Sequence, residues 1–162
     1  MRWLRHVFSP SIRRAFPPVR LQAITEAITA SELRHAGQVM FAVEPDLPLL
    51  ALCRGVSARQ RAEQAFAQLR TWDTEANNGV LIYLLLADHA IEIVADRGLR
   101  GKVGAPQWAE VCAHMQQRLR QGAPHDAVLL AIAEVSALLA HHYPPGPGAQ
   151  TDGLPNTPQL LG

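Results

Sequence analysis

The chain has 162 residues, 48 % hydrophobic and 18 % charged, so it can bury one packed core and is not a disordered polypeptide. Its 15 basic and 14 acidic side chains leave a formal net charge of +1, which argues against a dedicated nucleic-acid binder. No apolar run approaches the roughly 18 residues that a membrane span needs, and no apolar segment of a secretory signal follows the basic first residues. We therefore expect a cytoplasmic protein.

Residues 1–18, the N-terminal arm, are rich in arginine, aromatic residues and proline. The arm either packs on the domain or frays. Alternatively, its arginines and aromatic side chains contact a membrane surface weakly, as interfacial segments do. Pro10 interrupts the arm, which favours the first interpretation.

A helix is predicted from about residue 19 to residue 36, because apolar side chains recur there at helical spacing. Pro17 and Pro18 precede it, and Gly37 is placed to cap its C-terminus. A strand at residues 38–43 follows and ends before two prolines. The next long helix begins at Ser57, which forms the pattern of a capping box with Gln60, and the apolar residues 49–53 before it are compatible with a short helix.

The centre of the sequence predicts a long β-hairpin from Asn77 to Leu99. Residues 80–86 are apolar without alternation, as in a strand covered on both faces. Asp88 and His89 provide the turn, and residues 90–95 return as the second arm. Two more amphipathic helices follow, one around residues 108–119 and one from about residue 124.

This pattern gives the element order α-β-α-β-β-α-α. A strand, a crossover helix and a strand make a parallel unit, to which the hairpin adds an antiparallel strand. We therefore predict an α/β fold, a three-layer α/β/α sandwich with a mixed sheet. The domain should span residues 19–143, between the N-terminal arm and a disordered, proline- and glycine-rich tail at residues 144–162.

The two arms of an antiparallel hairpin bring the start of the first beside the end of the second. Oxygen-bearing side chains should therefore converge at the hairpin's open end: Asp73, Glu75, Asn77, Asn78 and Asp96. Carboxylate and amide oxygens suit hard cations such as Ca²⁺ or Mg²⁺. The same residue types are also ordinary turn formers, so a purely structural turn is the competing interpretation. The acidic residues at the opposite edge, including Glu44 and Asp88, make a weaker cluster.

Motifs for other chemistries are missing from the sequence. It has no H-E-x-x-H zinc motif, P-loop, dinucleotide-binding glycine pattern or G-x-S-x-G nucleophile motif. Its two cysteines, Cys53 and Cys112, do not have the spacing of a metal site. A covalent mechanism therefore has no support in the sequence, and catalytic residues cannot be assigned.

The hairpin resembles a known family, the TPM domain family. The matching residues run from Thr71 to Tyr83 (TWDTEANNGVLIY) and from Ile91 to Leu99 (IEIVADRGL). The order of elements from Leu21 to about Tyr143 also agrees. The resemblance implies an α/β/α sandwich and, in some relatives, binding of Ca²⁺ or Mg²⁺ by acidic loop residues. Asp73, Asn78 and Asp96 fall at the loop ends that such relatives use, with Glu75 and Asn77 as secondary candidates.

Weak acid phosphatase activity, ascribed to a plant relative in the thylakoid lumen, is a further implication of the resemblance. The chain lacks the export signal and the C-terminal membrane helix of many relatives, and it is similar to a short cytoplasmic bacterial branch of the family. We therefore expect a module that binds a divalent cation and a protein partner. A weak metal-dependent phosphomonoesterase and a peripheral membrane scaffold that uses the N-terminal arm are the alternatives.

Overall fold

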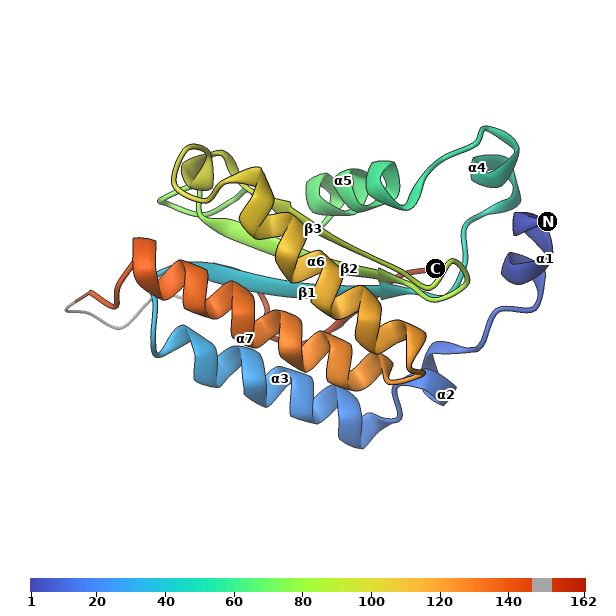
Figure 1. The fold of residues 1–162 in the computed structure, drawn as a ribbon, viewed down its shortest axis with the longest axis horizontal. Helices are drawn as coiled ribbons and strands as arrows, with labels where there is room; N and C mark the ends of the chain where they lie inside the picture. Colours follow the sequence, from blue (N-terminus) through green and yellow to red (C-terminus); the bar gives the residue numbers. More distant parts are fainter. Residues whose placement is uncertain (147–152) are drawn as a thin grey trace.

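The computed structural model describes residues 1–146 and 153–162. The elements, in chain order, are α1 (Arg2–Val7), α2 (Ile12–Ala15), α3 (Pro18–Glu32), β1 (Gln38–Glu44), α4 (Leu49–Cys53), α5 (Ala58–Gln68), β2 (Gly79–Leu85), β3 (Ala90–Ala95), the 3₁₀ helix η1 (Arg97–Leu99), α6 (Ala105–Arg120), α7 (Pro124–His142) and β4 (Gln159–Leu160). Figure 1 shows how they are arranged.

The four strands form one mixed sheet in the order β3-β2-β1-β4. β1 is parallel to β2 along its whole length, from Gln38 opposite Gly79 to Glu44 opposite Leu85. β2 and β3 form the predicted antiparallel hairpin, with Val80 opposite Ala95. The predicted mixed sheet, made of a parallel β-α-β unit and a hairpin, is therefore confirmed.

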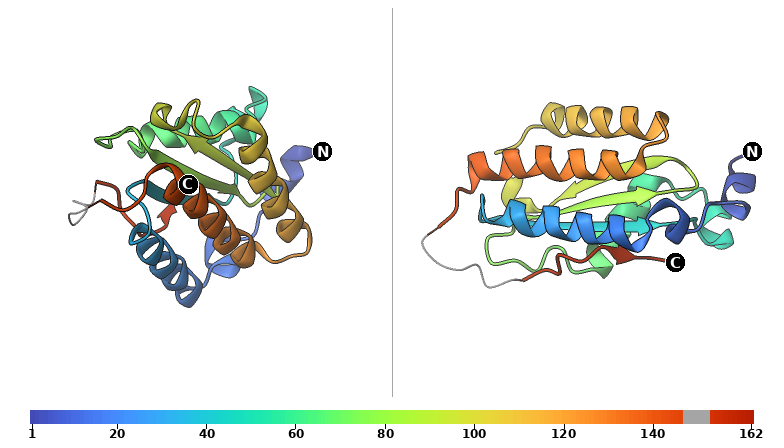
Figure 2. Two further views of the ribbon diagram at one scale, coloured as in Figure 1. Left: turned by 60° about the vertical axis from the view of Figure 1, so that its left-hand side comes forward. Right: turned by 90° about the horizontal axis from the view of Figure 1, so that it is seen from below.

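Helices cover both faces of the sheet, and alternate strand residues divide between two cores. On one face, Val39, Phe41 and Ile82 pack in a large cluster with residues of α3, α6 and α7. Those three helices lie side by side across that face (Figure 2). On the other face, Met40 and Leu81 pack against α5. Because both faces are covered, every residue of β1 and β2 is buried, which explains why β2 lacks the alternation of a half-exposed strand.

Three local predictions concern where helices begin and end. The capping box is confirmed, since the Ser57 side chain accepts from the backbone of Gln60 while the Gln60 side chain accepts from the backbone of Ser57. The segment at residues 49–53 is helical. The first long helix, however, ends at Glu32 rather than at residue 36, so Gly37 is not its cap. Gly37 instead packs closely on α7, where an added Cβ would lie 2.7 Å from Leu139 Cδ2.

The prediction of a disordered tail is wrong for residues 153–162. Residues 159–160 form β4, which pairs in parallel with Ala42 and Val43 of β1. Leu154 is 5 % exposed and packs in the core on the α5 side of the sheet. The apolar leucines and the open edge of β1 outweigh the proline-rich composition here. Residues 147–152 of the predicted tail lie outside the described residues.

The N-terminal arm is folded onto the domain. Phe16 is fully buried and packs against Phe41, with 5.9 Å between the centroids of the two rings. His6 is also buried, and the backbone amide of Leu47 donates to its Nδ1 at 2.9 Å. None of the helices in residues 1–146 or 153–162 is long and apolar enough to cross a membrane.

Candidate functional site

The open end of the hairpin, defined as residues 71–79 and 96–104, is held together by backbone hydrogen bonds. The amide of Asp96 donates to the carbonyl of Gly79 at 2.9 Å, and the amide of Gly98 donates to the carbonyl of Asn77 at 2.8 Å. These bonds continue the β2–β3 ladder beyond the last paired residues. The predicted convergence of the two chain segments is therefore present.

Gly98 permits the close approach of these two segments. A Cβ at this position would lie 2.4 Å from the carbonyl oxygens of both Ala76 and Asn77. No side-chain carbon fits at such a distance. The clashing atoms belong to the backbone, and moving them would cost folding free energy. The D-R-G sequence that follows β3 therefore has a steric cause for its glycine.

Asp96 is the acidic side chain most enclosed at the open end, with 9 % of its surface exposed. Its Oδ1 accepts from the backbone amide of Arg97 at 2.7 Å and so caps η1. Its Oδ2 is buried and has no hydrogen-bond partner among the described residues. A buried carboxylate oxygen without a partner costs free energy, and a bound water or a bound cation would satisfy it.

A cleft of about 570 Å³ lies beside Asp96, between α5, the end of β3 and the start of α6. Charged and aromatic side chains line part of its wall: Arg59, Asp96, Arg97, Arg100 and Trp108. Arg59 also donates to the carbonyl of Ile93 at 2.5 Å, which satisfies an edge group of β3. Arg59 is paired with Glu63 at 2.9 Å and lies 3.7 Å from Glu92, so the positive charge that the cleft offers comes from Arg97 and Arg100.

Two predicted amide residues help to build this end of the hairpin. Asn78 is 2 % exposed, and its side-chain Nδ2 donates to the carbonyl of Ala36 at 3.0 Å. Asn77 has a positive φ of 50°, a conformation that asparagine tolerates better than most residues. Its Oδ1 accepts from Arg97 Nε at 3.0 Å. Turn formation therefore accounts for much of what these amides do.

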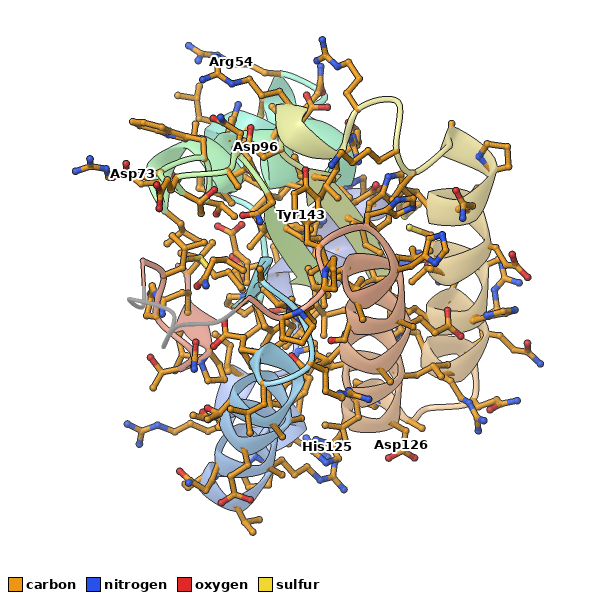
Figure 3. The ribbon with its side chains drawn as sticks, turned by 90° about the vertical axis from the view of Figure 1, so that its left-hand side faces the viewer. Arg54, Asp73, Asp96, His125, Asp126 and Tyr143 are labelled. Atoms are coloured by element: carbon orange, nitrogen blue, oxygen red, sulfur yellow. The ribbon has the colours of Figure 1, made fainter. Side chains whose placement is uncertain are left out.

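The predicted residues Asp73 and Glu75 are exposed. Asp73 lies at the same end of the molecule as Asp96 (Figure 3) and pairs with Arg70 at 2.6 Å. Within residues 1–146 and 153–162, no three His, Cys, Asp or Glu side chains are grouped closely enough to hold a metal ion. The described residues offer a cation one enclosed carboxylate oxygen, Asp96 Oδ2, and no closed acidic cage.

Sequence reasoning missed four further buried polar side chains: Glu32, His35, Gln38 and Thr71. The His35 ring donates from Nδ1 to the carbonyl of Gly37 at 3.0 Å, and burial lowers the pKa of His35. It also missed the arginines and Trp108 of the cleft. For the arginines after β3, the available signal was the cluster of basic residues Arg97, Arg100 and Lys102.

The opposite edge of the sheet holds the weaker acidic cluster, and its two innermost carboxylates are fully engaged. Glu44 is 1 % exposed and accepts from Arg61 at 2.8 and 2.9 Å and from the Tyr83 hydroxyl at 2.5 Å. Burial and this carboxylate raise the pKa of Tyr83. Asp88, in the hairpin turn, accepts from Arg2 at 2.7 and 2.9 Å and from His6 at 3.0 Å.

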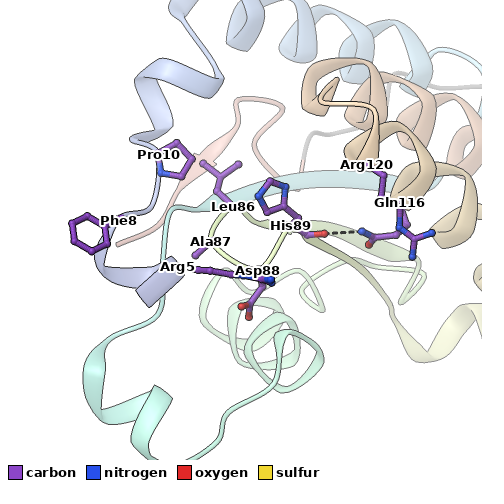
Figure 4. A pocket seen from close by; sticks show the side chains of 9 residues that line it. All are labelled: Arg5, Phe8, Pro10, Leu86, Ala87, Asp88, His89, Gln116 and Arg120. Atoms are coloured by element: carbon purple, nitrogen blue, oxygen red, sulfur yellow. Dashed lines mark hydrogen bonds between the residues drawn. The ribbon is translucent and has the colours of Figure 1, made fainter. Parts of the chain in front are cut away.

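A second hollow, of about 510 Å³, opens beside this turn (Figure 4). It lies between the N-terminal arm and α6, and the Gln116 side chain donates to the carbonyl of His89 across it at 2.8 Å. Asp88 contributes to its wall, but its oxygens are already bonded to Arg2 and His6. The candidate site is therefore the open end and not the turn.

Comparisons with known proteins agree with this architecture. The structure is similar to the solution structure of the BA42 protein from the psychrophilic bacterium Bizionia argentinensis, with a TM-score of 0.78 and 24 % identity over 93 % of this chain and 99 % of that one. It is also similar to the N-terminal domain of a P. gingivalis protein, with a TM-score of 0.63 and 14 % identity over 82 % of this chain and 83 % of that one. At these identities the likeness concerns the fold alone.

A search of curated proteins found no significant match. The family model of the TPM domain matches residues 13–138, which include both arms of the hairpin, the open end and every helix from α3 to α6. This match covers well over half of the chain and agrees with the resemblance carried by the hairpin. The chain belongs to the TPM domain family.

Proposed function

We propose that the open end of the hairpin binds a divalent cation, Ca²⁺ or Mg²⁺, through Asp96 and that the neighbouring cleft receives an anionic group of a protein partner. The observation that carries this proposal is the buried Oδ2 of Asp96, which lacks a partner in the described residues. A bound cation would give this negatively charged oxygen the partner that it lacks. It would also explain why a carboxylate is kept at a nearly buried position.

The cation site would be weak, because a single carboxylate supplies its charge and the buried Oδ2 of Asp96 must become accessible before an ion reaches it. Asp96 is the ligand that its burial singles out. Asn77 and Asn78 offer neutral oxygens on the neighbouring segment, which the bond from the Gly98 amide to the Asn77 carbonyl holds beside residues 96–98. Asp73, a primary ligand in the prediction from sequence, becomes a secondary one beside Glu75 in this proposal, because both side chains are exposed. Sites with a single carboxylate and several waters hold these ions with dissociation constants on the order of millimolar.

Titration of the full chain with CaCl₂ and with MgCl₂, followed by NMR and calorimetry, tests the cation site. We expect saturable shifts of the amides of Asn77, Asp96 and Gly98 at millimolar ion, and we expect Asp96→Asn to abolish them. KCl at matched ionic strength controls for screening. An absence of saturable shifts at the open end would refute the site.

Hydrolysis of phosphomonoesters is the second candidate, and the arginines of the cleft favour it. Arginine forks bind phosphate oxygens in a bidentate manner, and Arg100 is exposed on the cleft wall. A cation held at Asp96 would supply Lewis-acid chemistry for a phosphoryl group bound in the cleft. Arg97 and Arg100 would orient the phosphate, while Trp108 at the start of α6 would exclude water from one side.

A phosphatase assay with p-nitrophenyl phosphate, with and without EDTA, separates the two candidates. Hydrolysis that falls at least tenfold with EDTA and with Arg100→Gln supports catalysis in this cleft. Arg118→Gln is a matched control, because Arg118 lies on α6 away from the residues that line the cleft. Cation binding without hydrolysis leaves a binding module, and hydrolysis that survives Asp96→Asn belongs to another site or to a contaminant.

A further inference from the structure

The N-terminal arm and α4 form one end of the molecule, although α4 begins more than forty residues after α1 (Figures 1 and 2). Contacts on both sides of α4 hold them together. Before α4, Leu47 donates to His6, and Ser9 donates to Asp46 at 3.0 Å. After α4, Arg2 Nη1 donates to the carbonyl of Val56 at 2.8 Å.

These contacts use one face of α1 and leave its other face in solvent. His6 points inward, whereas Trp3, Val7 and Phe8 are 55 %, 62 % and 79 % exposed. On α4, Leu49 and Leu50 are 70 % and 61 % exposed, and none of its residues is buried. We call these five side chains the apolar tip. Half of the exposed large hydrophobic side chains in the described residues therefore lie on two short helices, or directly after the first of them, at one end of the molecule.

The charge around the apolar tip is one-sided. Residues 1–20 contain five arginines and no acidic residue. Arg5 and Arg54 are exposed on the two helices or directly after them. Asp88 is paired with Arg2 and bonded to His6, whereas Asp46 accepts only from the neutral Ser9 hydroxyl and keeps its charge. Arg5 and Arg54 outnumber this one carboxylate. The tip therefore presents apolar side chains with a basic surround.

We propose that the apolar tip docks on the surface of an anionic phospholipid bilayer. Tryptophan, phenylalanine and leucine side chains enter the boundary between headgroups and acyl chains, while arginines pair with lipid phosphates. Charge complementarity selects this occupant. A second copy of the chain would bring its own arginines to the same place and be repelled, whereas an anionic bilayer attracts them. This docking goes beyond the cation site and does not involve Asp96.

Co-sedimentation of the full chain with vesicles tests the proposal in EDTA, so that no cation bridges protein and lipid. Vesicles of phosphatidylcholine with phosphatidylserine are compared with vesicles of phosphatidylcholine alone. We expect binding to the anionic vesicles only, and weakening of at least tenfold as NaCl rises from 50 to about 300 mM.

Matched variants then locate the binding surface. Phe8→Ser and Leu33→Ser each replace a side chain that is 79 % exposed, but Leu33 follows α3 at the other end of the molecule. We expect Phe8→Ser/Leu49→Ser to weaken vesicle binding at least tenfold and Leu33→Ser to leave it unchanged. Circular dichroism checks that the variants are folded. We expect them to fold, because the replaced side chains are exposed and do not pack in the core.

Three results would overturn the proposal: no binding to anionic vesicles, equal losses in Phe8→Ser/Leu49→Ser and Leu33→Ser, or a dimer without lipid that Phe8→Ser dissociates. The last result would assign the tip to contact between copies. Failure of the cation site leaves this test intact, because Asp96→Asn should bind vesicles as the unchanged chain does.

Discussion

The two ends of the hairpin each carry a sheltered aspartate, but the two carboxylates are bonded differently. At the turn, the oxygens of Asp88 are occupied by Arg2 and His6. At the open end, Asp96 has one oxygen bonded to the Arg97 amide and a second without a partner in the described residues. A saturated carboxylate stabilises the fold, whereas an unsaturated one is available to a ligand. The comparison therefore separates architecture from candidate function within one supersecondary unit.

Adding a methyl group at Gly98 should have the largest effect. Gly98→Ala would push a Cβ into two carbonyl oxygens at 2.4 Å, so we expect it to lower the free energy of unfolding. The cost should be roughly 3 kcal/mol or more, as for severe overpacking, measured by urea denaturation. The cation response should disappear with it. Gly101→Ala is the control, because a Cβ there meets no atom within 4 Å and faces only the strain of φ +81°. A smaller loss of unfolding free energy in Gly98→Ala than in Gly101→Ala would contradict the steric argument.

Removing the charge at the turn should come next. Asp88→Asn would weaken the bonds to Arg2 and to the buried His6 ring, at a cost of about 2 kcal/mol. The N-terminal arm should loosen, which hydrogen exchange at the Leu47 amide would detect because this amide donates to His6. Cation binding at the open end should stay unchanged. Loss of the cation response in this variant would break the proposed division between the two ends.

The contribution of Asp88 should depend on pH. Burial acts to raise the pKa of Asp88, but hydrogen bonds from Arg2 and His6 outweigh it, so the pKa is lowered overall. The charged form is therefore favoured in the folded state. Its stabilisation is complete above the unfolded-state pKa of about 4 and is lost as the pH falls through the lower folded-state value. The stability difference between the unchanged chain and Asp88→Asn should shrink below about pH 4.

The same substitution at the open end should act on binding rather than on stability. Asp96→Asn keeps an oxygen that can cap η1 and removes a buried charge without a full set of partners. We expect the free energy of unfolding to change by less than about 1 kcal/mol, in either direction. The calcium and magnesium titration should become flat. A loss of 2 kcal/mol or more would show that Asp96 is structural, as Asp88 is.

Asp73→Asn should have the smallest effect. Asp73 is an exposed partner of Arg70, and such pairs contribute about 0–1 kcal/mol. We expect no measurable change in stability and at most a twofold weakening of cation binding, read by calorimetry. Complete loss of binding in Asp73→Asn would move the primary ligand from the enclosed carboxylate to the exposed loop.

Local rules predicted the fold where neighbouring residues determine it. The capping box at Ser57 and the apolar runs of β2 and β3 are signals within a few residues, and the hairpin then fixes which loop residues meet. This is why the approach of Asn77 and Asn78 to Asp96 could be predicted. The position of Asp73, away from a grouped metal site, could not, because it depends on how an exposed loop folds around Arg70.

Long-range contacts produced the errors. The parallel pairing of residues 159–160 with β1 joins segments more than a hundred residues apart, and proline-rich composition conceals it. The bond from Leu47 to His6 likewise crosses forty-one positions. The end of α3 at Glu32 rather than at residue 36 reflects the inward packing of His35 and the contact of Gly37 with α7. The partnerless oxygen of Asp96 is a property of side-chain packing, which no sequence pattern encodes.

The short β4 strand covers one edge of the sheet, and its few contacts determine how easily that edge is exposed. Its register with β1 comprises two residue pairs, and the amide of Leu161 donates to the carbonyl of Val43. Pairing β4 with β1 closes a long loop, and only a few hydrogen bonds compensate for the loss of chain entropy. We therefore expect this pairing to form late in folding and to open first in the native state. When it opens, the backbone of β1 at Ala42 and Val43 becomes an unpaired sheet edge that can accept a strand from another chain. The C-terminal strand thus protects β1 from edge-to-edge association.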